Sequence, residues 1–495
     1  MPAPRTVAPS EERLAPTSCE VRETHTGLVF LAGGFAYKAK KPIATDFLDF
    51  RAVGERERVC EREVLLNRRL APKSYLGVGH FIPPDGTAPE PVIVMHRYQD
   101  RIRLRSMVEQ GEPVEPHLTD LAGRLAAFHA RAERSREIDD AATVARIAER
   151  WQENLSELDR LGAESGLSPG QICEARRLAM SYIAGRRLLF DARTDEQRVV
   201  DGHGDLLADD IFCTSSGPVP LDCLEFDDQL RYVDGLDDAA FLAMDLEFLG
   251  RPDLSALFLD SYRHAAEDGA PQSLAHFYIA YRAVVRAKVD CIRMSQGRSG
   301  ADEDARRHLE LALDHLRAAT ARLILIGGGP GTGKSTLAAA LHESLDAEVI
   351  STDVVRRELQ RSGDLSGTAG DVDGGLYTPG NVARVYAVVL ERAAGVMARG
   401  RSVILDATWR DPRQRQRAME VAQRASAAMV EIACQANLSL SQHRIGTRGP
   451  TSSDATAAIA AEITSAPWPG AHTVDTSRPL AESIADAQRI CCLAF

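Results

Sequence analysis

The feature that most constrains this chain is a glycine-rich segment at residues 328–335, which reads Gly-Gly-Pro-Gly-Thr-Gly-Lys-Ser. It lies between an apolar, strand-like run at 322–326 and a helix-forming run at 337–345. Glycines in such a loop let consecutive backbone N–H groups wrap a polyphosphate, because a Cβ would block the turn. The N-terminus of the following helix faces the same anion. The pattern G-x-x-x-x-G-K-[ST] in this setting predicts a nucleoside triphosphate site.

The side chains of this segment have separate predicted roles. Lys334 is expected to reach the β- and γ-phosphates, and the hydroxyl of Ser335 is expected to hold Mg²⁺. The alternative is a glycine-rich turn without a ligand, which the agreement between loop and flanking runs disfavours. The residues expected to bind the nucleotide are Gly328, Gly329, Pro330, Gly331, Thr332, Gly333, Lys334, Ser335 and Thr336.

Two further apolar runs end in acidic residues. The run at 347–352 leads to Asp353, and the run at 402–405 leads to Asp406. Because ligands of parallel α/β sheets bind outside the carboxyl ends of the strands, both carboxylates are expected to face the phosphate loop. Asp406 suits the carboxylate that holds Mg²⁺ through water. Asp353 suits a base that takes the proton of an acceptor hydroxyl, with Arg356 one turn further on holding a phosphate; its alternative role is a helix cap.

Arginines further along are candidates for stabilising charge in the transition state. Arg444 and Arg448 are spaced i, i+4, so on a helix they would share one face and close over the phosphates as a lid. The alternative is a solvated arginine face, and the sequence leaves both open. Arg410, Arg413 and Arg417 are more simply interpreted as surface residues.

Length, charge and cysteine usage limit the number of domains, the binding partners and the cellular compartment that the sequence allows. The chain has 495 residues, too many for one core, and a formal net charge of −12, which gives no long-range attraction to nucleic-acid polymers or anionic membranes. Its nine cysteines form no C-x-x-C pair, which is typical of a reducing cytosol. Residues 1–18 have no apolar core for a signal peptide and are expected to be disordered. No apolar run reaches the length of a membrane helix, so a cytoplasmic protein is expected.

The part of the chain that precedes the phosphate loop shows both strand and helix patterns. Short apolar runs bounded by glycines predict strands, and longer amphipathic runs predict helices. The strands are expected within 25–41, 91–97 and 199–223, and the helices at 55–70, 116–134, 139–160, 168–190 and 302–320.

A second set of chemical residues lies in this part. A His-Gly-Asp tripeptide ending at Asp205 follows an apolar strand, as in kinases that present a catalytic base in a tight turn. Lys38 at the end of a strand and Glu63 in the following helix have the order of the pair that positions phosphates in that fold. Downstream, the run at 221–226 reads as a strand that ends in acids.

The C-terminal motifs resemble a known group of enzymes. GGPGTGKST, STDVVRREL, SVILDATW, RIGTR and SSDAT, within residues 321–476, look like the P-loop kinases grouped with zeta toxins, gluconate kinases and polynucleotide kinases. The resemblance implies phosphorylation of a hydroxyl with ATP and Mg²⁺. It assigns the phosphate-binding lysine to Lys334, the base of a D-x-x-R pair to Asp353, and the lid arginine to Arg444 or Arg448.

The N-terminal motifs resemble the aminoglycoside phosphotransferase (choline-kinase-like) family. The supporting segments are AYK at 36–38, EVLL at 63–66, LAAFH at 125–129, HGD at 203–205 and DGLDDAAF at 234–241. The resemblance implies a two-lobed, protein-kinase-like fold with Asp205 as the base and with Lys38 and Glu63 at the nucleotide. The whole chain then resembles bacterial two-domain proteins in which such a domain is fused to a P-loop kinase domain.

Two positions depart from the pattern of that family. The metal-binding asparagine of its loop is replaced by Asp210, and the metal-binding aspartate of its I-D-F triplet is replaced by Glu225, with Asp222 and Asp227 as possible stand-ins. We expect Asp210 and Glu225 to be the metal ligands here, although the longer glutamate moves the metal unless the backbone compensates.

These observations predict an architecture and three candidate functions. The architecture is an α+β, protein-kinase-like domain at 19–320, followed by a doubly wound, parallel α/β domain at 321–495. The favoured function is an ATP- and Mg²⁺-dependent kinase for a hydroxyl of a small molecule or nucleotide sugar, with catalysis mainly in the C-terminal domain. The second makes the N-terminal domain the enzyme and the P-loop domain regulatory. The third is a non-catalytic, ATP-binding sensor or toxin-like protein.

Overall fold

The computed structural model describes residues 19–23, 27–43, 49–84, 86, 88–368, 374–447 and 468–494. The expected N-terminal tail, Arg448 and the SSDAT segment lie outside these ranges. Contacts between residues divide the chain into two compact units, Met1–Glu133 with Val200–Glu267, and Arg134–Val199 with Asp268–Phe495. These units cross the boundary expected between 320 and 321, which stays a prediction.

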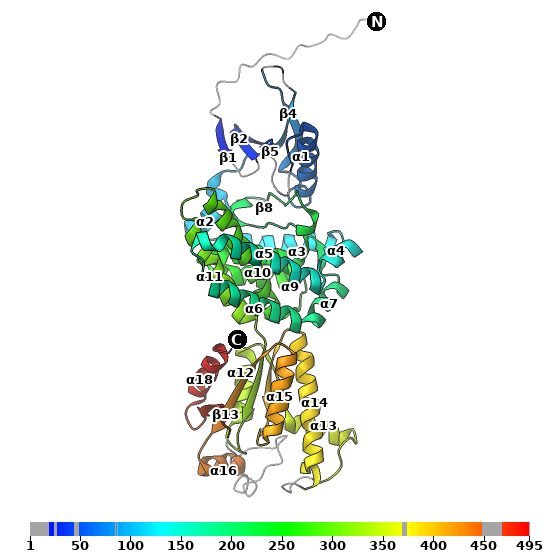
Figure 1. The fold of residues 1–495 in the computed structure, drawn as a ribbon, viewed down its shortest axis with the longest axis vertical. Coiled ribbons are helices and arrows are strands. Elements are labelled where there is room, and N and C mark those ends of the chain that lie inside the picture. Colours follow the sequence, from blue (N-terminus) through cyan, green and yellow to red (C-terminus); the bar gives the residue numbers. More distant parts are fainter. Residues whose placement is uncertain are drawn as a thin grey trace. The chain divides into compact units, whose positions relative to one another are not determined.

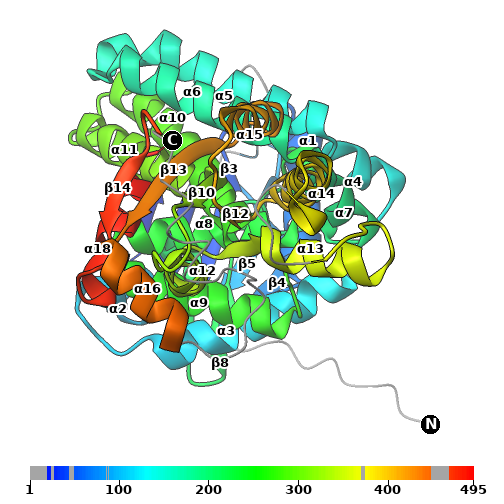
Figure 2. The same cartoon turned by 90° about the horizontal axis from the view of Figure 1, so that it is seen from below.

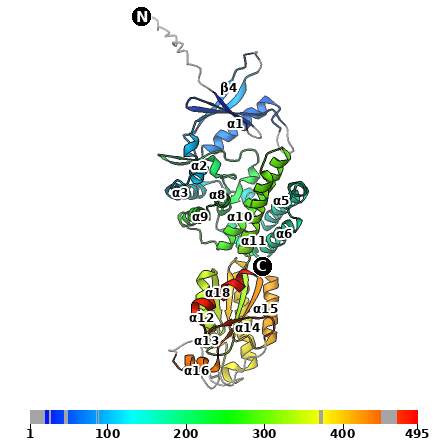
Figure 3. The ribbon, with the colours of Figure 1, turned by 90° about the vertical axis from the view of Figure 1, so that its left-hand side faces the viewer.

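The first unit begins with a five-stranded antiparallel sheet in the order β1-β2-β3-β5-β4. Helix α1 (Val53–Asn67) lies against this sheet, where Cys60 and Val64 pack on Tyr75 and Ile93 (Figure 3). The strands are β1 (Glu20–Glu23), β2 (Gly27–Ala32), β3 (Phe35–Lys40), β4 (Tyr75–Phe81) and β5 (Glu90–His96).

The rest of the first unit is built on helices and two small two-stranded sheets. Helix α8 (Gly235–Phe248) is buried from its first residue to Leu246, which explains the apolar run at 239–244. The remaining elements are η1 (Asp100–Ile102), α2 (Leu104–Glu109), α3 (Glu115–Arg131), β6 (Val199–Asp201), η2 (Ala208–Asp210), β7 (Ile211–Thr214), β8 (Gly217–Pro220), η3 (Asp228–Leu230), β9 (Tyr232–Asp234) and α9 (Pro252–Ala265). A sheet-and-helix lobe followed by this second lobe confirms the predicted protein-kinase-like fold.

The second unit contains a group of helices that precedes the phosphate loop. The aromatic rings of Trp151, Tyr182 and Phe277 form its centre, with ring centroids 5.3 Å apart for Trp151 and Phe277 and 4.4 Å apart for Tyr182 and Phe277. The helices are α4 (Arg136–Ala141), α5 (Val144–Ser165), α6 (Pro169–Gly185), α7 (Arg187–Asp195), α10 (Gln272–Ser295) and α11 (Ala301–Ala319).

The second unit also contains a five-stranded, fully parallel sheet in the order β11-β12-β10-β13-β14. Helices α12 and α18 cover one face of the sheet, and α14 and α15 cover the other (Figures 1 and 2). The strands are β10 (Arg322–Gly327), β11 (Ala347–Ser351), β12 (Ser402–Asp406), β13 (Ala428–Gln435) and β14 (His472–Asp475). The helices are α12 (Lys334–Ser344), α13 (Thr352–Arg361), η4 (Gly375–Tyr377), α14 (Pro379–Ala398), α15 (Pro412–Arg424), α16 (Leu438–Thr447) and α18 (Leu480–Cys492).

Successive residues of the central strand β10 serve opposite cores. Leu323 and Leu325 pack towards α14 and α15, whereas Ile324 and Ile326 pack towards α12 and α18. A strand buried on both faces therefore carries a continuous aliphatic run instead of an alternating one. This arrangement confirms the predicted doubly wound parallel sheet. No helix in the described part of the chain is long and apolar enough to cross a membrane.

Candidate functional site

The loop between β10 and α12 has the backbone of a phosphate cradle. Gly328, Gly331 and Gly333 have φ angles of +140°, +75° and +84°, a region that favours glycine. The loop is also closely packed, since a Cβ on Gly331 would lie 2.4 Å from the backbone oxygen of Ser441. Helix α12 begins at Lys334, so its first N–H groups open towards the loop.

The predicted metal-binding residues of this loop lie together. The hydroxyl of Ser335 donates a hydrogen bond to Oδ2 of Asp406 over 2.6 Å, and Nζ of Lys334 donates to the backbone oxygen of Gly329 over 2.9 Å. Burial raises the pKa of Asp406 above its ordinary value, an effect that Lys334 and Ser335 partly oppose. A carboxylate and a hydroxyl are hard oxygen donors, so this pair fits Mg²⁺ held jointly with phosphate oxygens.

Asp353 and Arg356 form an ion pair in the first turns of α13. Nη1 of Arg356 donates to Oδ1 of Asp353 over 2.5 Å, and the Arg356 guanidinium lies 4.4 Å from the ring centroid of Tyr377. The N-cap of α13 is Ser351, so Asp353 does not have the capping role that was its alternative. Ser351 at the end of β11 pairs with Asp406 at the end of the parallel strand β12, so Asp353, which follows β11, lies at the same end of the sheet as Asp406.

Arg444 of α16, one of the two candidate lid arginines, lies beside the phosphate loop. Nη2 of Arg444 donates to the backbone oxygen of Thr476 over 2.8 Å, and a Cβ on Gly333 would lie 3.4 Å from Nη1 of Arg444. The hydroxyl of Thr476 donates to the backbone oxygen of Thr332 over 2.6 Å, which joins this arginine to the loop. Sequence reasoning missed Thr476 and Tyr377, because neither belongs to a recognisable local motif. Arg410, Arg413 and Arg417 are exposed, in agreement with their interpretation as surface residues.

The first unit holds a second cluster of predicted site residues. Nζ of Lys38 lies 2.8 Å from Oε1 of Glu63 and 2.5 Å from Oδ1 of Asp222. Burial alone would lower the pKa of Lys38, but Asp222 and Glu63 outweigh it and raise this pKa well above its ordinary value, so the lysine is charged. The strand lysine and helix glutamate are therefore paired as predicted, and one acidic residue from the run 221–226 joins them.

The carboxylates expected to hold a metal in this unit have different surroundings. Glu225 pairs with Lys40, Nζ to Oε1 2.5 Å, whereas Asp222 faces Lys38. Burial opposes ionisation of Asp222, but Lys38 outweighs it and lowers its pKa. Burial, and then the charges of Asp222 and Asp205, raise the pKa of Asp210 well above its ordinary value. The charges of Asp205 and Asp222 therefore both act on Asp210, whereas Glu225 contacts Lys40.

The loop that carries Asp205 is fixed by acidic residues of α8. The backbone N–H groups of His203 and Gly204 donate to the two carboxylate oxygens of Asp238 over 2.7 and 2.8 Å. Oδ2 of Asp238 also lies 2.9 Å from Nε2 of His129. A Cβ on Gly202 would lie 2.7 Å from Oδ2 of Asp238, so the loop passes close to this carboxylate. The loop conformation is therefore set by a helix that follows it by some thirty residues in sequence.

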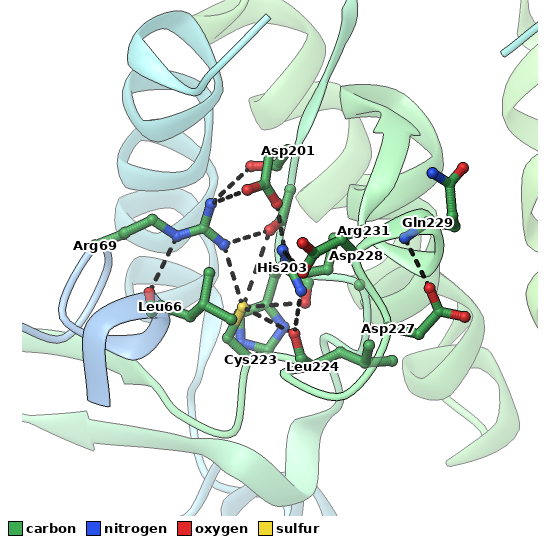
Figure 4. Close-up of polar contacts among 12 residues, drawn as sticks. Leu66, Arg69, Asp201, His203, Cys223, Leu224, Asp227, Asp228, Gln229 and Arg231 are labelled. Atoms are coloured by element: carbon green, nitrogen blue, oxygen red, sulfur yellow. Dashed lines mark hydrogen bonds and ion pairs between the residues drawn. The ribbon is translucent and has the colours of Figure 1, made fainter. Parts of the chain in front are cut away.

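Two arginines connect this loop to residues 221–226, as Figure 4 shows. We call residues 221–226 the metal-side segment, because its acids include the expected metal ligand Glu225. Arg69 donates to the backbone oxygens of Asp201 and Gly202 over 3.1 and 2.8 Å, and to Sγ of Cys223 over 3.3 Å. Arg231, which is fully buried, donates to Oδ1 of Asp201 over 2.8 Å and to the backbone oxygen of Leu224 over 2.9 Å. Sequence reasoning missed both arginines, since their partners lie far away in the chain.

The described carboxylates suit a metal ion that is bound together with a nucleotide. Within the described ranges, no group of three or more His, Cys, Asp or Glu side chains is arranged to hold a metal ion by itself. Mg²⁺ usually takes one or two carboxylates and completes its shell with phosphate oxygens and water. The pairs described above therefore fit Mg²⁺ that enters with a nucleoside triphosphate.

The fold and the two clusters define a protein with two kinase-like parts, one protein-kinase-like and one of the P-loop type. The chain belongs to the same family as uncharacterized proteins of Mycobacterium tuberculosis and Mycobacterium bovis, with which it is 51% identical over 473 residues, or 95% of each chain. A family model described as an AAA domain matches residues 323–466.

Several solved structures are similar to parts of the chain. A choline/ethanolamine kinase family protein from Mesorhizobium loti is 14% identical and covers 60% of this chain and 93% of its own, with a TM-score of 0.34. A choline kinase from Cryptosporidium parvum is 10% identical and covers 62% of this chain and 90% of its own, with a TM-score of 0.41. A gluconokinase from Sinorhizobium meliloti is 18% identical and covers 34% of this chain and 90% of its own, with a TM-score of 0.26.

Proposed function

We propose that this protein is an ATP- and Mg²⁺-dependent phosphotransferase whose acceptor is a hydroxyl of a small molecule or nucleotide sugar, with catalysis mainly in residues 321–495. The observation that carries the proposal is the 2.6 Å contact between Ser335 and Asp406 beside the phosphate loop. Loop, lysine, hydroxyl and carboxylate are the parts that P-loop phosphotransferases use to bind a magnesium nucleotide.

The residues of this site divide the reaction between them. The loop N–H groups and Lys334 bind the β- and γ-phosphates, and Ser335 and Asp406 would hold Mg²⁺, which neutralises phosphate charge when bound. The acceptor oxygen attacks the γ-phosphorus, and the bond from that phosphorus to the β–γ bridging oxygen breaks, so ADP leaves. The acceptor proton passes to Asp353, which Arg356 holds in place. Arg444 stabilises charge on the transferred group.

The setting of the reaction follows from charge and composition. With a net charge of −12, the protein has no long-range attraction to polyanions, which supports a small acceptor and not a nucleic-acid polymer. The cysteines described by the structure are free thiols, which supports work in a reducing cytoplasm.

Incubation of the full-length protein with Mg²⁺, γ-labelled ATP and a panel of sugars, nucleosides, nucleotide sugars and amino alcohols tests this proposal. Labelled product is expected for one acceptor class, and it should disappear in Lys334→Ala but persist in Lys73→Ala, a matched change at an exposed lysine. ATP binding without turnover on any acceptor would favour the non-catalytic sensor instead.

A second candidate function is phosphotransfer in the first unit. It is favoured by one observation, the simultaneous contact of Lys38 with Glu63 and Asp222. A lysine held between a helix glutamate and a metal-side aspartate is the arrangement that kinases require for nucleotide binding. In this candidate Asp205 is the base, and Asp210 and Asp222 are the residues that would hold Mg²⁺.

A further inference from the structure

Lys40 has a position in the first unit that the kinase pattern does not account for. It lies two residues after Lys38 on β3, so the alternation of the strand puts both lysines on the same face of the sheet. The side chain of Lys40 is only 1% exposed. A lysine is rarely buried to this extent unless it has a charged partner. A lysine so placed needs carboxylates around it, and it has two.

The two lysines share one glutamate and each holds one acid of the metal-side segment. Oε1 of Glu63 lies 2.8 Å from Lys38, and Oε2 lies 2.6 Å from Lys40. Nζ of Lys38 also lies 2.5 Å from Oδ1 of Asp222, and Nζ of Lys40 also lies 2.5 Å from Oε1 of Glu225. Two parallel ion pairs therefore join strand β3 to the segment that holds Asp222.

The two ion pairs respond differently to a nucleotide. Phosphate oxygens attract Lys38 away from Asp222, because the ammonium group is the phosphate contact of this fold. Lys40 contacts Glu225 and the Oε2 atom of Glu63, whereas Lys38 contacts the Oε1 atom of Glu63, so the contacts of Lys40 can remain when Lys38 exchanges Asp222 for a phosphate. Glu225 has a side chain that is only 10% exposed, which keeps this second pair away from the solvent that would screen it.

We propose that Lys40 and Glu225 form a positioning ion pair, which holds residues 222–225 against β3 so that Lys38 and Asp222 stay aligned for a nucleoside triphosphate. Glu225 is then a positioning residue and not a metal ligand. The role in catalysis rests on the second candidate function, whereas the holding of the segment does not.

Removal of Lys40 has a defined electrostatic consequence. Lys40→Met leaves two buried carboxylates, Glu63 and Glu225, with Lys38 as the remaining nearby cation. An uncompensated buried charge is strongly unfavourable, so the segment around Glu225 is expected to move towards solvent. Glu225→Gln removes one end of the pair while keeping the shape of the side chain, and it leaves the contact of Lys40 with Glu63.

Hydrogen exchange of the nucleotide-free, full-length protein tests the holding role. Amides of 221–226 are expected to exchange about 10-fold faster in Lys40→Met, and faster to a smaller extent in Glu225→Gln. Lys41→Met is the matched control, because Lys41 pairs with Glu23 at the surface, where Glu23 is 72% exposed. Unchanged exchange at 221–226, or a uniform increase over the whole unit, would overturn the proposal; should Lys40→Met fail to fold, Glu225→Gln decides.

ATP kinetics in a Lys334→Ala background test the role towards the nucleotide. Lys40→Met is expected to raise KM for ATP about 10-fold and to change kcat much less, because a misplaced Lys38 weakens binding before chemistry. An equal loss in Lys41→Met, or a fall in kcat alone, would contradict the positioning role. If the Lys334→Ala parent binds no ATP, the second candidate function fails, and the exchange result still decides whether the pair holds the segment.

Discussion

Gly331 shows how two independent constraints select one residue type. Its φ is +75°, and a Cβ would meet the backbone oxygen of Ser441 at 2.4 Å. Gly331→Ala is therefore expected to cost about 1–3 kcal/mol of backbone strain and to abolish the stabilisation that Mg-ATP gives in thermal unfolding. Gly446→Ala is the control, since Gly446 lies in α16 with nothing within 4 Å of its Cβ position. Equal ATP stabilisation in both variants would show that the loop tolerates a side chain.

Asp353 carries the prediction that concerns the acceptor. Asp353→Asn removes the proton acceptor but not the phosphate contacts, so ATP affinity should persist while acceptor phosphorylation falls about 10²-fold or more. The measurement is kcat with the acceptor found in the screen, together with the Kd for ATP. Asp364→Asn, at a side chain that is 46% exposed, is the control. Loss of ATP affinity with normal acceptor turnover would mean that Asp353 serves the metal instead.

At the scale of elements, α8 holds the loop of Asp205 through one ionised carboxylate. Burial opposes ionisation of Asp238, but His129 and the backbone N–H of His203 outweigh it and hold its pKa well below the ordinary value. A depressed carboxyl pKa contributes stability above the unfolded pKa of about 4, and this contribution is lost as pH falls below that value. Folding stability in the first unit is thus coupled to the geometry of its candidate catalytic loop.

This coupling predicts that the free energy of unfolding differs between wild type and Asp238→Asn by an amount that depends on pH. Asp238→Asn should lower the free energy of unfolding by about 3 kcal/mol near pH 7, and the deficit should shrink as pH falls below about 4, where wild type loses the same interaction. Urea unfolding at a series of pH values measures it. Asp253→Asn is the control, because its ion pair with Arg251 is at the surface. A deficit that is constant with pH would mean that Asp238 acts through packing and not through charge.

At the scale of the whole molecule, one chain carries two candidate nucleotide sites. The proposed site in residues 321–495 has a candidate residue for each role in its chemistry, whereas in the first unit the resemblance puts an aspartate, Asp210, where its family has an uncharged metal ligand. Most ATP turnover of the full-length protein should therefore be lost in Lys334→Ala and retained in Asp205→Ala. Steady-state ADP release at saturating Mg-ATP, with and without acceptors, measures this. The opposite result would make the first unit the enzyme.

The sequence by itself determined the features that depend on neighbours along the chain. Glycine spacing and apolar flanks predicted the phosphate loop, and continuous aliphatic runs predicted the doubly wound sheet, because backbone conformation and strand burial are local demands. The order of lysine, glutamate and His-Gly-Asp predicted a protein-kinase-like fold. The sequence predicted the ends of helices less accurately, because packing also influences where a helix stops. One helix was expected at 168–190, whereas the structure has two, α6 and α7, which are separated at Arg186.

The tertiary structure decided which charges meet. The resemblance to the aminoglycoside phosphotransferase family favoured Glu225 as the metal-side acid, with Asp222 and Asp227 as possible stand-ins. In the structure, β3 packs against a segment more than 180 residues away, which places Asp222 beside Lys38 and Glu225 beside Lys40. The anchoring of the Asp205 loop by Asp238 was equally absent from local patterns. The physical reason is that buried charges exchange partners when one of two distant segments shifts by a single residue along the other. Only the packed core fixes how the two segments are aligned.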